Sequence, residues 1–419
     1  MLTIELKMAW RNIWRNTRRT LLTACAICFA SVLLIFMLSL QFGSYATMIN
    51  ASVKIHTGHL QIQAAGYHEK KRMRMVVPEP EAVASVVASI AAVDVWTYRA
   101  NAFSMVSTAD RTYGALVIGI APEREAHVST LKQTIQNGRY FPTDDRSTPS
   151  DLTPALVGCL LAENLGITVG DELTIMGQGR DGSVAATVAR VIGIYKSGMD
   201  GFDRSTVQIP LTAFQSIYTM GTAVHEVVVI GSSLKKVPGI KAAAAARLKD
   251  RFPDADLAVL DWENLVPGLK QAISLDLVMG VIMYFILVVV VAFSILNTFL
   301  MALFERTHEF GILMAVGTQR SRLTRVLVAE SAMLTFLGSI AGVVIGILVT
   351  LYFQARGIDV SGSSEILSQY GISGKIHPRL SFFTVIAGPS IVYLITILSA
   401  LYPALKIRRM TPLEALAHV

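Results

Sequence analysis

The stretch LVMGVIMYFILVVVVAFSILNTFLMALF, residues 277–304, carries no charged side chain between Asp276 and Glu305. A bilayer core about 30 Å thick requires roughly 20 consecutive apolar residues of a helix that crosses it. Hydrocarbon offers no partner to backbone N–H and C=O groups, so a crossing segment must satisfy them internally, as a helix does. The stretch therefore predicts a transmembrane helix at 275–303.

Three further apolar runs have the same character, and Glu330 is their only ionised residue. They predict transmembrane helices at 20–50, 325–355 and 380–405. The first run is long and has no clear small-residue cleavage site, so we interpret it as a permanent anchor and not as a signal peptide. About 220 residues of water-soluble character separate the first two runs, which indicates one large extramembrane domain at 51–270.

The distribution of lysine and arginine predicts the orientation of the chain. Cations precede the first span, lie between the second and third spans, and follow the fourth: Lys7, Arg11, Arg15, Arg18, Arg19, Arg306, Arg320, Arg322, Arg325, Lys406, Arg408 and Arg409. Cytoplasmic segments carry an excess of such residues, so the segments 1–19, 304–324 and 406–419 are predicted to be cytoplasmic. The domain and the loop 356–379 are then expected outside.

The composition agrees with a membrane protein. Hydrophobic residues make up 53% of the 419 residues, and the mean hydropathy is +0.51. The pI near 9.3 does not predict nucleic-acid binding, because the cations flank membrane spans, where anionic lipid attracts them. Three cysteines provide no disulfide framework, since Cys159 has no partner outside. Cys25 and Cys28 share one face of the first span and are interpreted as small residues at a helix interface, in preference to a redox or metal pair.

Residues 2–18 have the periodicity of an amphipathic helix. Its apolar face carries Leu2, Leu6, Ala9, Trp10, Ile13 and Trp14, and its basic face carries Lys7, Arg11, Arg15 and Arg18. A basic helix with two tryptophans is expected to lie in the membrane interface. We therefore predict an interfacial elbow helix at 1–19, with Trp10, Arg11, Trp14 and Arg15 as its interface residues. The alternative is a simple extension of the first span.

The extramembrane domain shows both strand and helix patterns. Expected elements are strands at 59–63 and 256–260, a hairpin of 95–109 with 111–120, a helix at 157–165 ended by Gly166, and helices at 79–92 and 235–250. A turn-rich segment at about 122–222 separates two βαβ-like patterns, which predicts a β-rich subdomain inserted into a second one. A helix from Trp262 is expected to lead straight into the second span. The predicted fold class is membrane α-helical, with four transmembrane helices, plus an α+β extracytoplasmic domain of two subdomains.

Motifs that could indicate enzymatic chemistry have structural interpretations here. Gly177, Gly179 and Gly182 spell G-x-G-x-x-G, but a strand-like run follows instead of the helix that a dinucleotide site needs, so we predict a hairpin turn. The chain has no G-x-x-x-x-G-K-[ST] sequence and no HExxH or clustered Cys/His pattern. We therefore predict no catalytic residue, no metal site and no P-loop ATPase activity in this chain.

Glu330 is the one carboxylate within an apolar run. Ionisable groups in hydrocarbon are costly and often functional. Because Glu330 lies five residues after Arg325, a position at the cytoplasmic end, paired with a nearby arginine, is favoured over a role as a substrate relay.

The segment ERTHEFGILMAVGTQRSRLTRVLVAESAML, residues 305–334, follows the second span. Its glycines could bound a short amphipathic helix that presents Glu305, Arg306 and Glu309 to a partner. The segment closely resembles the coupling segment, roughly E-R-x-x-E-I-G-x-x-R-A-x-G, of permease subunits in the MacB, FtsX and LolC/LolE superfamily of ABC transporters. The matching residues are Glu305, Arg306, Glu309, Gly311, Ala315 and Gly317, whereas Phe310 and Met314 replace an aliphatic and a basic residue.

Other stretches carry the same resemblance. The opening LKMAWRNIWRNTRRTLL is similar to the family's N-terminal elbow, and YPALKIRRMTPLEALAH resembles its C-terminal motif, with Pro403, Ala404, Pro412, Glu414, Ala415 and Leu416 in place. TGHLQIQAAGYHE and LLAENLGITVGDELTI look most like the LolC/LolE branch. The resemblance covers essentially the whole chain.

The resemblance implies a multi-pass permease of the bacterial inner membrane, with its large domain in the periplasm. It implies pairing with a second permease copy or a paralogue and with two separate ATPase subunits, which bind ATP and Mg; this chain itself has no cofactor and is not an enzyme. The implied ATPase contact comprises Glu305, Arg306, Glu309, Gly311, Met314 and Gly317.

The leading functional hypothesis is the extraction of lipoproteins or lipids from the inner membrane for transfer to a periplasmic carrier. The first alternative is a MacB-like tripartite efflux permease. The second is an FtsX-like signalling protein that transports nothing, although the large two-part domain favours transport.

Overall fold

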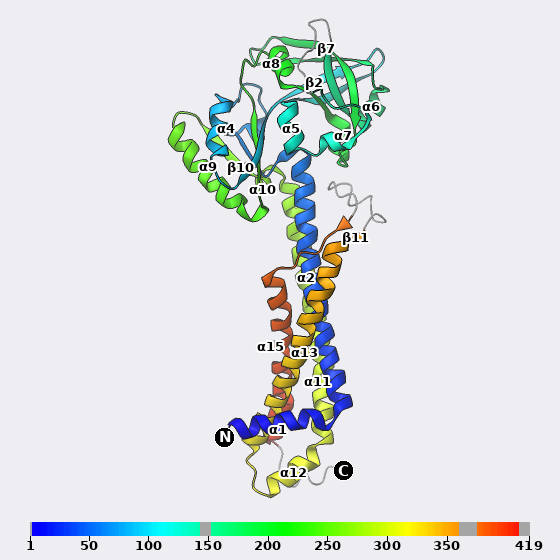
Figure 1. Cartoon of the computed structure of the whole chain (residues 1–419), viewed down its shortest axis with the longest axis vertical. Coiled ribbons are helices and arrows are strands. Elements are labelled where there is room, and N and C mark those ends of the chain that lie inside the picture. The colour runs from blue at the N-terminus through cyan, green and yellow to red at the C-terminus, as the bar shows by residue number, and fades with distance from the viewer. Residues whose placement is uncertain (1, 143–151, 360–374, 410–419) are drawn as a thin grey trace. The chain divides into compact units, whose positions relative to one another are not determined.

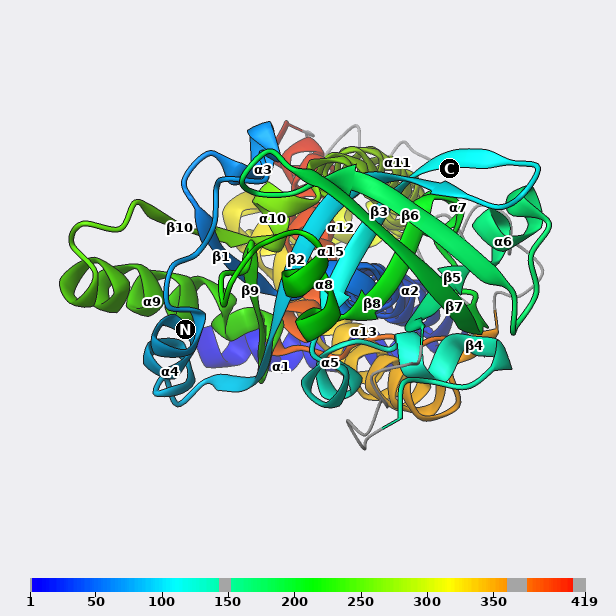
Figure 2. The same cartoon turned by 90° about the horizontal axis from the view of Figure 1, so that it is seen from above.

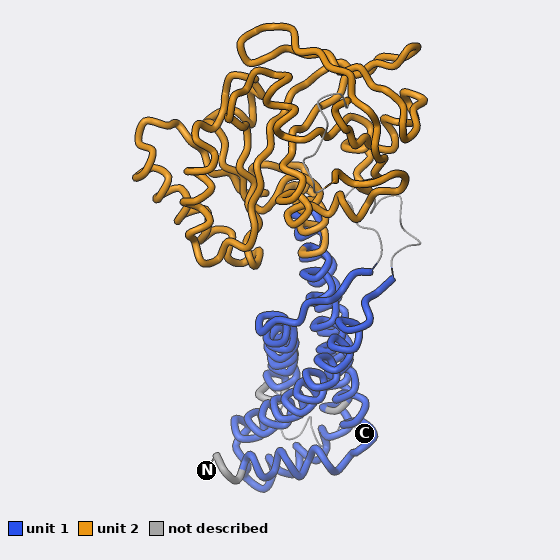
Figure 3. Tube along the Cα trace, turned by 45° about the horizontal axis from the view of Figure 1, so that its top comes forward, with its two compact units in different colours: residues 1–45, 273–359, 375–419 blue, residues 46–272, 360–374 orange. Residues whose placement is uncertain are grey.

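The computed structural model describes residues 2–142, 152–359 and 375–409. The chain divides into two compact units (Figures 1 and 3). Unit 1 contains residues 1–45, 273–359 and 375–419, and unit 2 contains residues 46–272 and 360–374.

Four helices of the described chain are long and apolar enough to cross a membrane, as predicted (Figure 1). They are α2 (Thr17–Ser52), α11 (Pro267–Glu305), α13 (Arg320–Arg356) and α15 (Phe382–Arg409). The remaining elements of unit 1 are α1 (Leu2–Arg15), α12 (Thr307–Ala315), β11 (Ile358–Asp359) and β12 (Lys375–Ile376). The predicted motif residues Pro412, Glu414, Ala415 and Leu416, and most of the loop 356–379, lie outside the described residues.

Helix α13 packs closely on α2 through three glycines. Gly338, Gly342 and Gly346 are buried and follow the G-x-x-x-G spacing that lets membrane helices approach each other. A Cβ at Gly342 would lie 2.6 Å from the Cβ of Ser31 and 2.8 Å from the carbonyl oxygen of Cys28. Cys28 thus lies at a helix interface, as predicted. The same prediction is wrong for Cys25, which is exposed because residues three apart differ by about 60° around a helix.

Unit 2 is built on one sheet of ten strands. The strands are β1 (Leu60–Ala64), β2 (Val93–Ser107), β3 (Thr112–Ile120), β4 (Ile135–Gly138), β5 (Thr153–Gly158), β6 (Glu172–Gln178), β7 (Val184–Tyr195), β8 (Thr206–Pro210), β9 (Glu226–Gly231) and β10 (Leu257–Asp261). Their order is β10-β1-β9-β2-β3-β8-β5-β7-β4, with β6 between β2 and β7 (Figure 2). The β3–β8 and β5–β7 pairs are parallel, and the other pairs are antiparallel.

Short helices connect these strands. They are the π-helical turn η1 (Val53–Thr57), α3 (Tyr67–Lys70), α4 (Pro80–Ala88), α5 (Pro122–Val128), η2 (Leu131–Thr134), α6 (Cys159–Leu165), α7 (Asp200–Ser205), α8 (Leu211–Ile217), η3 (Leu234–Lys236), α9 (Val237–Arg251) and α10 (Trp262–Leu265). Unit 2 is therefore the mixed helix and strand domain that the sequence predicts.

Two hydrophobic cores of unit 2 meet along the long strand β2. Tyr98 belongs to the core under α4 and α9, whereas Ala100 belongs to the core under α6 and α8. The predicted start of the inserted subdomain near residue 122 is wrong, because Ala115 and Val117 of β3 already lie in the second core. The reason is that β2 spans both cores and pairs with β9 near one end and with β6 near the other.

Local turn chemistry agrees with the sequence in most places. Gly166 ends α6 in the left-handed conformation, with φ 71°. Gly179 and Gly182 lie in the turn that joins β6 to β7, so the glycine motif forms the predicted hairpin. The expectation of one helix from Trp262 into the second span is wrong. Val266 leaves the helical conformation, with φ −128° and ψ 67°, because a residue before a proline is disfavoured there.

Candidate coupling site

Helix α12 is a separate nine-residue helix between two long ones. Arg306, between α11 and α12, has φ −106° and ψ 5°, which interrupts the helix. Gly317 follows α12 with φ +97°, a conformation that a residue with a Cβ adopts only under strain. These two residues determine where α12 begins and ends.

The inner face of α12 is apolar and buried. Phe310 and Met314 pack with Leu303, Leu323 and Ala404 from the neighbouring helices. Gly311, on the same face, is also buried. The helix is thereby fixed against the ends of α11, α13 and α15 within unit 1.

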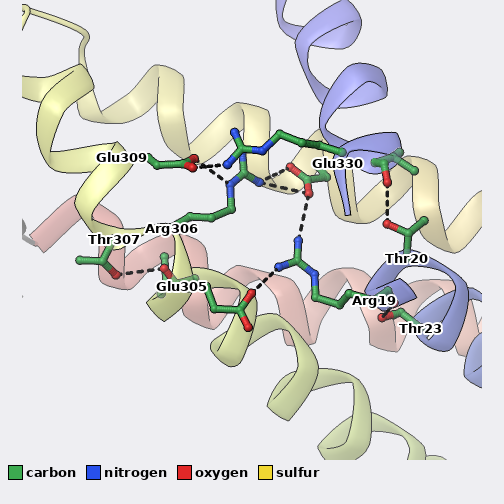
Figure 4. A network of polar contacts seen from close by, with 11 residues as sticks. Arg19, Thr20, Thr23, Glu305, Arg306, Thr307, Glu309 and Glu330 are labelled. Atoms are coloured by element: carbon green, nitrogen blue, oxygen red, sulfur yellow. Dashed lines mark hydrogen bonds and ion pairs between the residues drawn. The ribbon is translucent and has the colours of Figure 1, made fainter. Parts of the chain in front are cut away.

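Six charged residues around α12 form what we call the coupling cluster: Arg15, Arg19, Glu305, Arg306, Glu309 and Glu330 (Figure 4). Nη1 of Arg306 donates to Glu330 at 2.9 Å. Arg19 lies 3.0 Å from Glu305 and 3.9 Å from Glu330. The side chains of Arg306 and Glu330 are only 14% and 12% exposed. Removing either residue would therefore leave the charge of the other largely buried without a counter-charge.

Glu309 connects α12 to α1. Its carboxylate accepts a hydrogen bond from Arg15 and lies 3.5 Å from Nε of Arg306. The hydrogen bond from Arg15, together with the charges of both arginines, holds the pKa of Glu309 below its usual range. The carboxylate is therefore ionised throughout the neutral range.

A second set of ion pairs joins α1 to α13. The buried carboxylate of Glu5 accepts a hydrogen bond from Arg325 at 2.9 Å and lies 4.0 Å from Nε of Arg322. The predicted pairing of Glu330 with an arginine is confirmed. Its partners are Arg306 and Arg19, however, because its sequence neighbour Arg325 is bound to Glu5.

The predicted elbow residues lie on α1, which ends at Arg15 and so is shorter than expected. Ala9 and Ile13 are buried, whereas Trp10 and Trp14 remain 45% and 57% exposed. The two indole rings contact each other edge to face, with centroids 5.9 Å apart. Arg11 is exposed, as expected of an interface residue. Arg15 differs, since it is paired with Glu309.

Among the six predicted ATPase-contact residues, the charged ones face other parts of the same unit. Glu305, Arg306 and Glu309 are all ion-paired within the coupling cluster, and Gly311 and Met314 are buried. Gly317 and Glu305 are exposed. The segment also exposes three apolar side chains: Ile312, Leu313 and Val316 are 47%, 38% and 82% exposed. This apolar surface is not among the predicted contact residues, because the resemblance rests on the charged residues and glycines of the segment.

The outer end of α2 is fixed within unit 2. Nη2 and Nε of Arg99 donate to the two carboxylate oxygens of Glu125 at 2.6 and 3.1 Å, and both side chains are 1% exposed. Nη1 of Arg99 lies 3.2 Å from Nδ1 of His56, in η1. The hydroxyl of Ser129 donates to the carbonyl of Ile55 at 2.7 Å. The turn that continues α2 is therefore bound to β2 and to the loop after α5.

No group of three His, Cys, Asp or Glu side chains in the described ranges lies close enough together to hold a metal ion. The arrangement in unit 1 offers ion pairing and helix contacts.

Comparison with known proteins accounts for both units. The MacB-like periplasmic core domain matches residues 20–247, and the FtsX-like permease C-terminal domain matches residues 281–412. A lipoprotein-releasing system transmembrane protein, LolC, from Neisseria meningitidis is 24% identical over 75% of this chain and 76% of its own. The macrolide export ATP-binding/permease protein MacB of Escherichia coli is 22% identical over 99% of this chain and 60% of its own.

A solved structure is also similar to part of this chain. The periplasmic region of MacB from Actinobacillus actinomycetemcomitans is 16% identical, covers 53% of this chain and 94% of its own, and gives a TM-score of 0.37. The two domain matches together span most of the chain, and the first alone covers more than half of it. The chain belongs to the MacB, FtsX and LolC/LolE superfamily of ABC transporter permeases.

Proposed function

We propose that this chain is the permease subunit through which a separate ATPase subunit drives movement of an extracytoplasmic domain in a bacterial inner membrane. The observation that carries the proposal is the coupling cluster. In it, the acidic residues Glu305 and Glu309 on either side of the start of α12 are paired with Arg19 and Arg15, at the junction of α1 and α2. A displacement of α12 then moves the start of α2.

The exposed apolar face of α12 is the proposed contact for the ATPase subunit. Ile312 and Val316 are one helical turn apart, and Leu313 lies beside them. An amphipathic helix that lays such a face into a groove is a common mode of recognition. In this proposal the charges of the coupling cluster do not recognise the ATPase. They transmit the movement of α12 to α1 and α2.

The route outward is helix α2. One uninterrupted helix of 36 residues leads from Thr17 to Ser52, and η1 continues it to Thr57. The contacts of His56 with Arg99 and of Ile55 with Ser129 fix its outer end to the sheet of unit 2. A continuous helix with named contacts near each end can act as the element whose position the ATPase biases.

We propose lipoproteins or other membrane lipids as the substrate, released to a periplasmic carrier. The support is the similarity to LolC proteins over three quarters of both chains. A second candidate is MacB-like efflux of small molecules, supported by similarity to MacB over 99% of this chain. FtsX-like signalling without transport is a third candidate, supported by the FtsX-like match in unit 1.

The coupling proposal is tested by separating ATPase binding from ATPase stimulation. We expect Val316→Asp to abolish copurification with the ATPase, because it places a charge in an apolar contact. Glu309→Lys should keep that binding and lose stimulation of ATP hydrolysis, and Arg15→Glu combined with Glu309→Lys should recover part of it. Loss of ATPase binding in Glu309→Lys with normal binding in Val316→Asp would contradict the proposal. It would assign ATPase binding to the charged residues of the coupling cluster instead of the exposed apolar face of α12.

The substrate proposal is tested in proteoliposomes that contain the permease, its ATPase and a fluorescent lipoprotein. ATP-dependent appearance of lipoprotein in the soluble fraction, when a carrier is added, is the expected result. Release of a macrolide but not of lipoprotein would support the efflux candidate. Release of neither, with intact ATPase stimulation, would favour signalling.

A further inference from the structure

Helix α2 is held from two sides shortly before it leaves unit 1. Residues 39–45 of α2 contact α11 on one side and the segment 377–384, which leads into α15, on the other. All of these residues belong to unit 1, whose first stretch of chain ends at residue 45. We call residues 39–45, together with these contacts, the collar.

The side of the collar that faces α11 is polar. The carboxylate of Asp276 accepts a hydrogen bond from the hydroxyl of Tyr45 at 2.5 Å and from Nε2 of Gln41 at 3.3 Å. Oε1 of Gln41 accepts a hydrogen bond from the hydroxyl of Tyr284 at 2.8 Å. A Cβ at Gly280 would lie 2.5 Å from Nε2 of Gln41, so this glycine leaves room for the amide. These contacts join α2 to α11 at the outer end of the apolar run of α11.

The opposite side of the collar meets backbone atoms. The backbone N–H of Arg379 donates to the carbonyl oxygen of Ser39 at 2.8 Å, and the hydroxyl of Ser39 donates to Oγ1 of Thr384 at 3.1 Å. A Cβ at Gly43 would lie 2.9 Å from the backbone nitrogen of Arg379 and 2.9 Å from Cα of Pro378. Backbone atoms cannot give way as the end of a side chain can. The segment therefore crosses α2 here because residue 43 is a glycine.

The collar and the coupling cluster are separated by about one membrane thickness. Arg19 of the coupling cluster pairs with Glu305, the last residue of α11, and Gln41 follows 22 residues later, about 33 Å along α2. The hydrocarbon core of a bilayer is about 30 Å thick. Polar contacts thus join α2 to α11 near both membrane surfaces. These are also the helices that cross the boundaries between the two units, at residues 45–46 and 272–273.

We infer that the collar is the pivot of α2, about which α2 and α11 move together while residues 39–45 keep their place against α15. The inference rests on the proposed function, in which a displaced α12 moves the start of α2. Asp276 and Tyr284 make α11 follow α2. A slide of α2 along its axis would carry Gly43 away and bring a side chain against the backbone of residues 377–379. A tilt about Gly43 avoids that clash, so the parts of α2 on either side of the collar move in opposite directions.

The test measures distances within one chain in proteoliposomes that contain the permease and its ATPase. The three native cysteines are replaced by alanine, and labelled chains are diluted with unlabelled ones. Spin labels at Val281 and Phe382 report the distance from α11 to α15 beside the collar, and labels at Met301 and Leu398 report it near the cytoplasmic ends. All four side chains are exposed, so the labels do not replace packed groups. When ADP and vanadate trap the ATPase, we expect the inner distance to change and the outer distance to stay the same.

Substitution of Gly43 tests the backbone contact. Gly43→Val places a branched side chain against residues 377–379, and we expect the outer distance to broaden and to change when the ATPase is trapped. Ser44→Val is the matched control, because it adds the same side chain at the next position, about 100° around the helix. It should behave as the original protein does. Copurification with the ATPase shows that each variant is folded.

Substitution of Asp276 tests the connection between α2 and α11. Asp276→Leu removes the acceptor of the Tyr45 hydroxyl, whereas Asp276→Asn keeps an acceptor of similar size. We expect the fraction of chains with a longer outer distance to rise about 10-fold in Asp276→Leu, the low end of the range for a hydrogen bond to a charged group. Asp276→Asn should restore most of the original distribution, which a general loss of folding would not do.

Three outcomes would overturn the inference. Equal changes of the outer and inner distances on trapping would show that α2 and α11 move without a fixed point, and would leave the proposed function intact. No change of either distance would contradict the proposed function as well, because a helix that does not move has no pivot. Equal distance distributions in Gly43→Val and Ser44→Val would show that the crossing segment does not hold α2.

Discussion

Two of the clusters of arginine and glutamate in the described structure differ in their surroundings. In unit 2, Arg99 and Glu125 are both 1% exposed, and each meets the other through two hydrogen bonds. In unit 1, the coupling cluster ranges from Glu330, with a side chain 12% exposed, to Arg15, with one 59% exposed. In the coupling cluster, Arg19 and Arg306 each pair with two glutamates. In the buried pair, Arg99 pairs with one glutamate.

This difference separates two uses of the same chemistry. A buried ion pair cannot be opened without leaving a charge in a medium of low dielectric constant. An exposed pair can exchange its partner for water at little cost. We infer that the pair of unit 2 holds the end of α2 in one arrangement, while the more exposed pairs around α12 contribute little to stability and connect α12 to α1 and α2.

The largest expected effect is the loss of one partner of the buried pair. Arg99→Met leaves the carboxylate of Glu125 buried without its counter-charge, and we expect it to destabilise unit 2 by about 3–5 kcal/mol. Urea unfolding of a fragment containing residues 50–270, which we expect to fold independently, measures this loss. Arg99→Met combined with Glu125→Leu should recover most of the stability, because no unpaired charge remains. A loss below about 1 kcal/mol in the single variant would show that the pair is not rigid.

The next effect is a pH dependence of unit 2 that comes from His225. Its Nδ1 accepts from the backbone N–H of Asn101 at 3.0 Å, and its Nε2 lies 3.2 Å from the carbonyl of Met73. Burial, opposed by the hydrogen bond to Met73 and assisted by the charges of Lys71 and Arg180, lowers the pKa of His225 to about 4. The folded state therefore holds this histidine neutral at pH values where the unfolded state protonates it.

The direction of this pH dependence follows from the number of protons that each state binds. The unfolded histidine binds a proton below about pH 6.5, so the stabilising contribution is complete above that pH and declines as the pH falls towards 4. We expect the free energy of unfolding to fall by about 3 kcal/mol over this window through His225. His225→Asn, which keeps an acceptor near Nδ1, should flatten the dependence when unfolding is measured at several pH values. If the slope of the free energy of unfolding against pH is unchanged in His225→Asn, the pH dependence comes from other groups.

An intermediate effect is expected in the less exposed part of the coupling cluster. Glu330→Gln removes the counter-charge of Arg306 but keeps an acceptor of similar size. We expect the membrane protein to lose about 1.5–3 kcal/mol, the range for hydrogen bonds to charged groups, measured as reduced thermal stability in detergent. Glu172→Gln is the control, because its pair with Arg190 is more than half exposed and spans 3.6 Å. Equal losses of thermal stability in Glu330→Gln and Glu172→Gln would contradict the expectation that the less exposed ion pair contributes more.

Much of this organisation could be predicted from the sequence. Charge-free runs predicted the four long helices, because a bilayer imposes their length, and glycine signals predicted the turns at Gly166 and Gly182. The partners of the ionised residues could not be predicted: Arg15 meets Glu309, 294 positions away, and Arg19 meets Glu305, 286 positions away. Such pairs depend on packing, and one sequence offers many arginines for each carboxylate. The close packing of α13 has a sequence signal, since Gly338, Gly342 and Gly346 follow the G-x-x-x-G spacing.

The smallest effect on stability, and the sharpest test of the comparison, is expected at Arg15. The side chains of Arg15 and Glu309 are 59% and 41% exposed, so Arg15→Gln should cost less than about 1 kcal/mol. If the pair transmits movement, the same substitution should reduce ATPase stimulation strongly while folding and ATPase copurification stay normal. High salt should weaken stimulation in the original protein, since it screens exposed charges, and should have less effect on Arg15→Gln. Arg11→Gln, which removes a neighbouring cation with no ion pair in the described structure, is the matched control. Equal losses in Arg11→Gln and Arg15→Gln would reduce the role of α1 to attraction of the membrane surface and leave the start of α2 without this connection to α12.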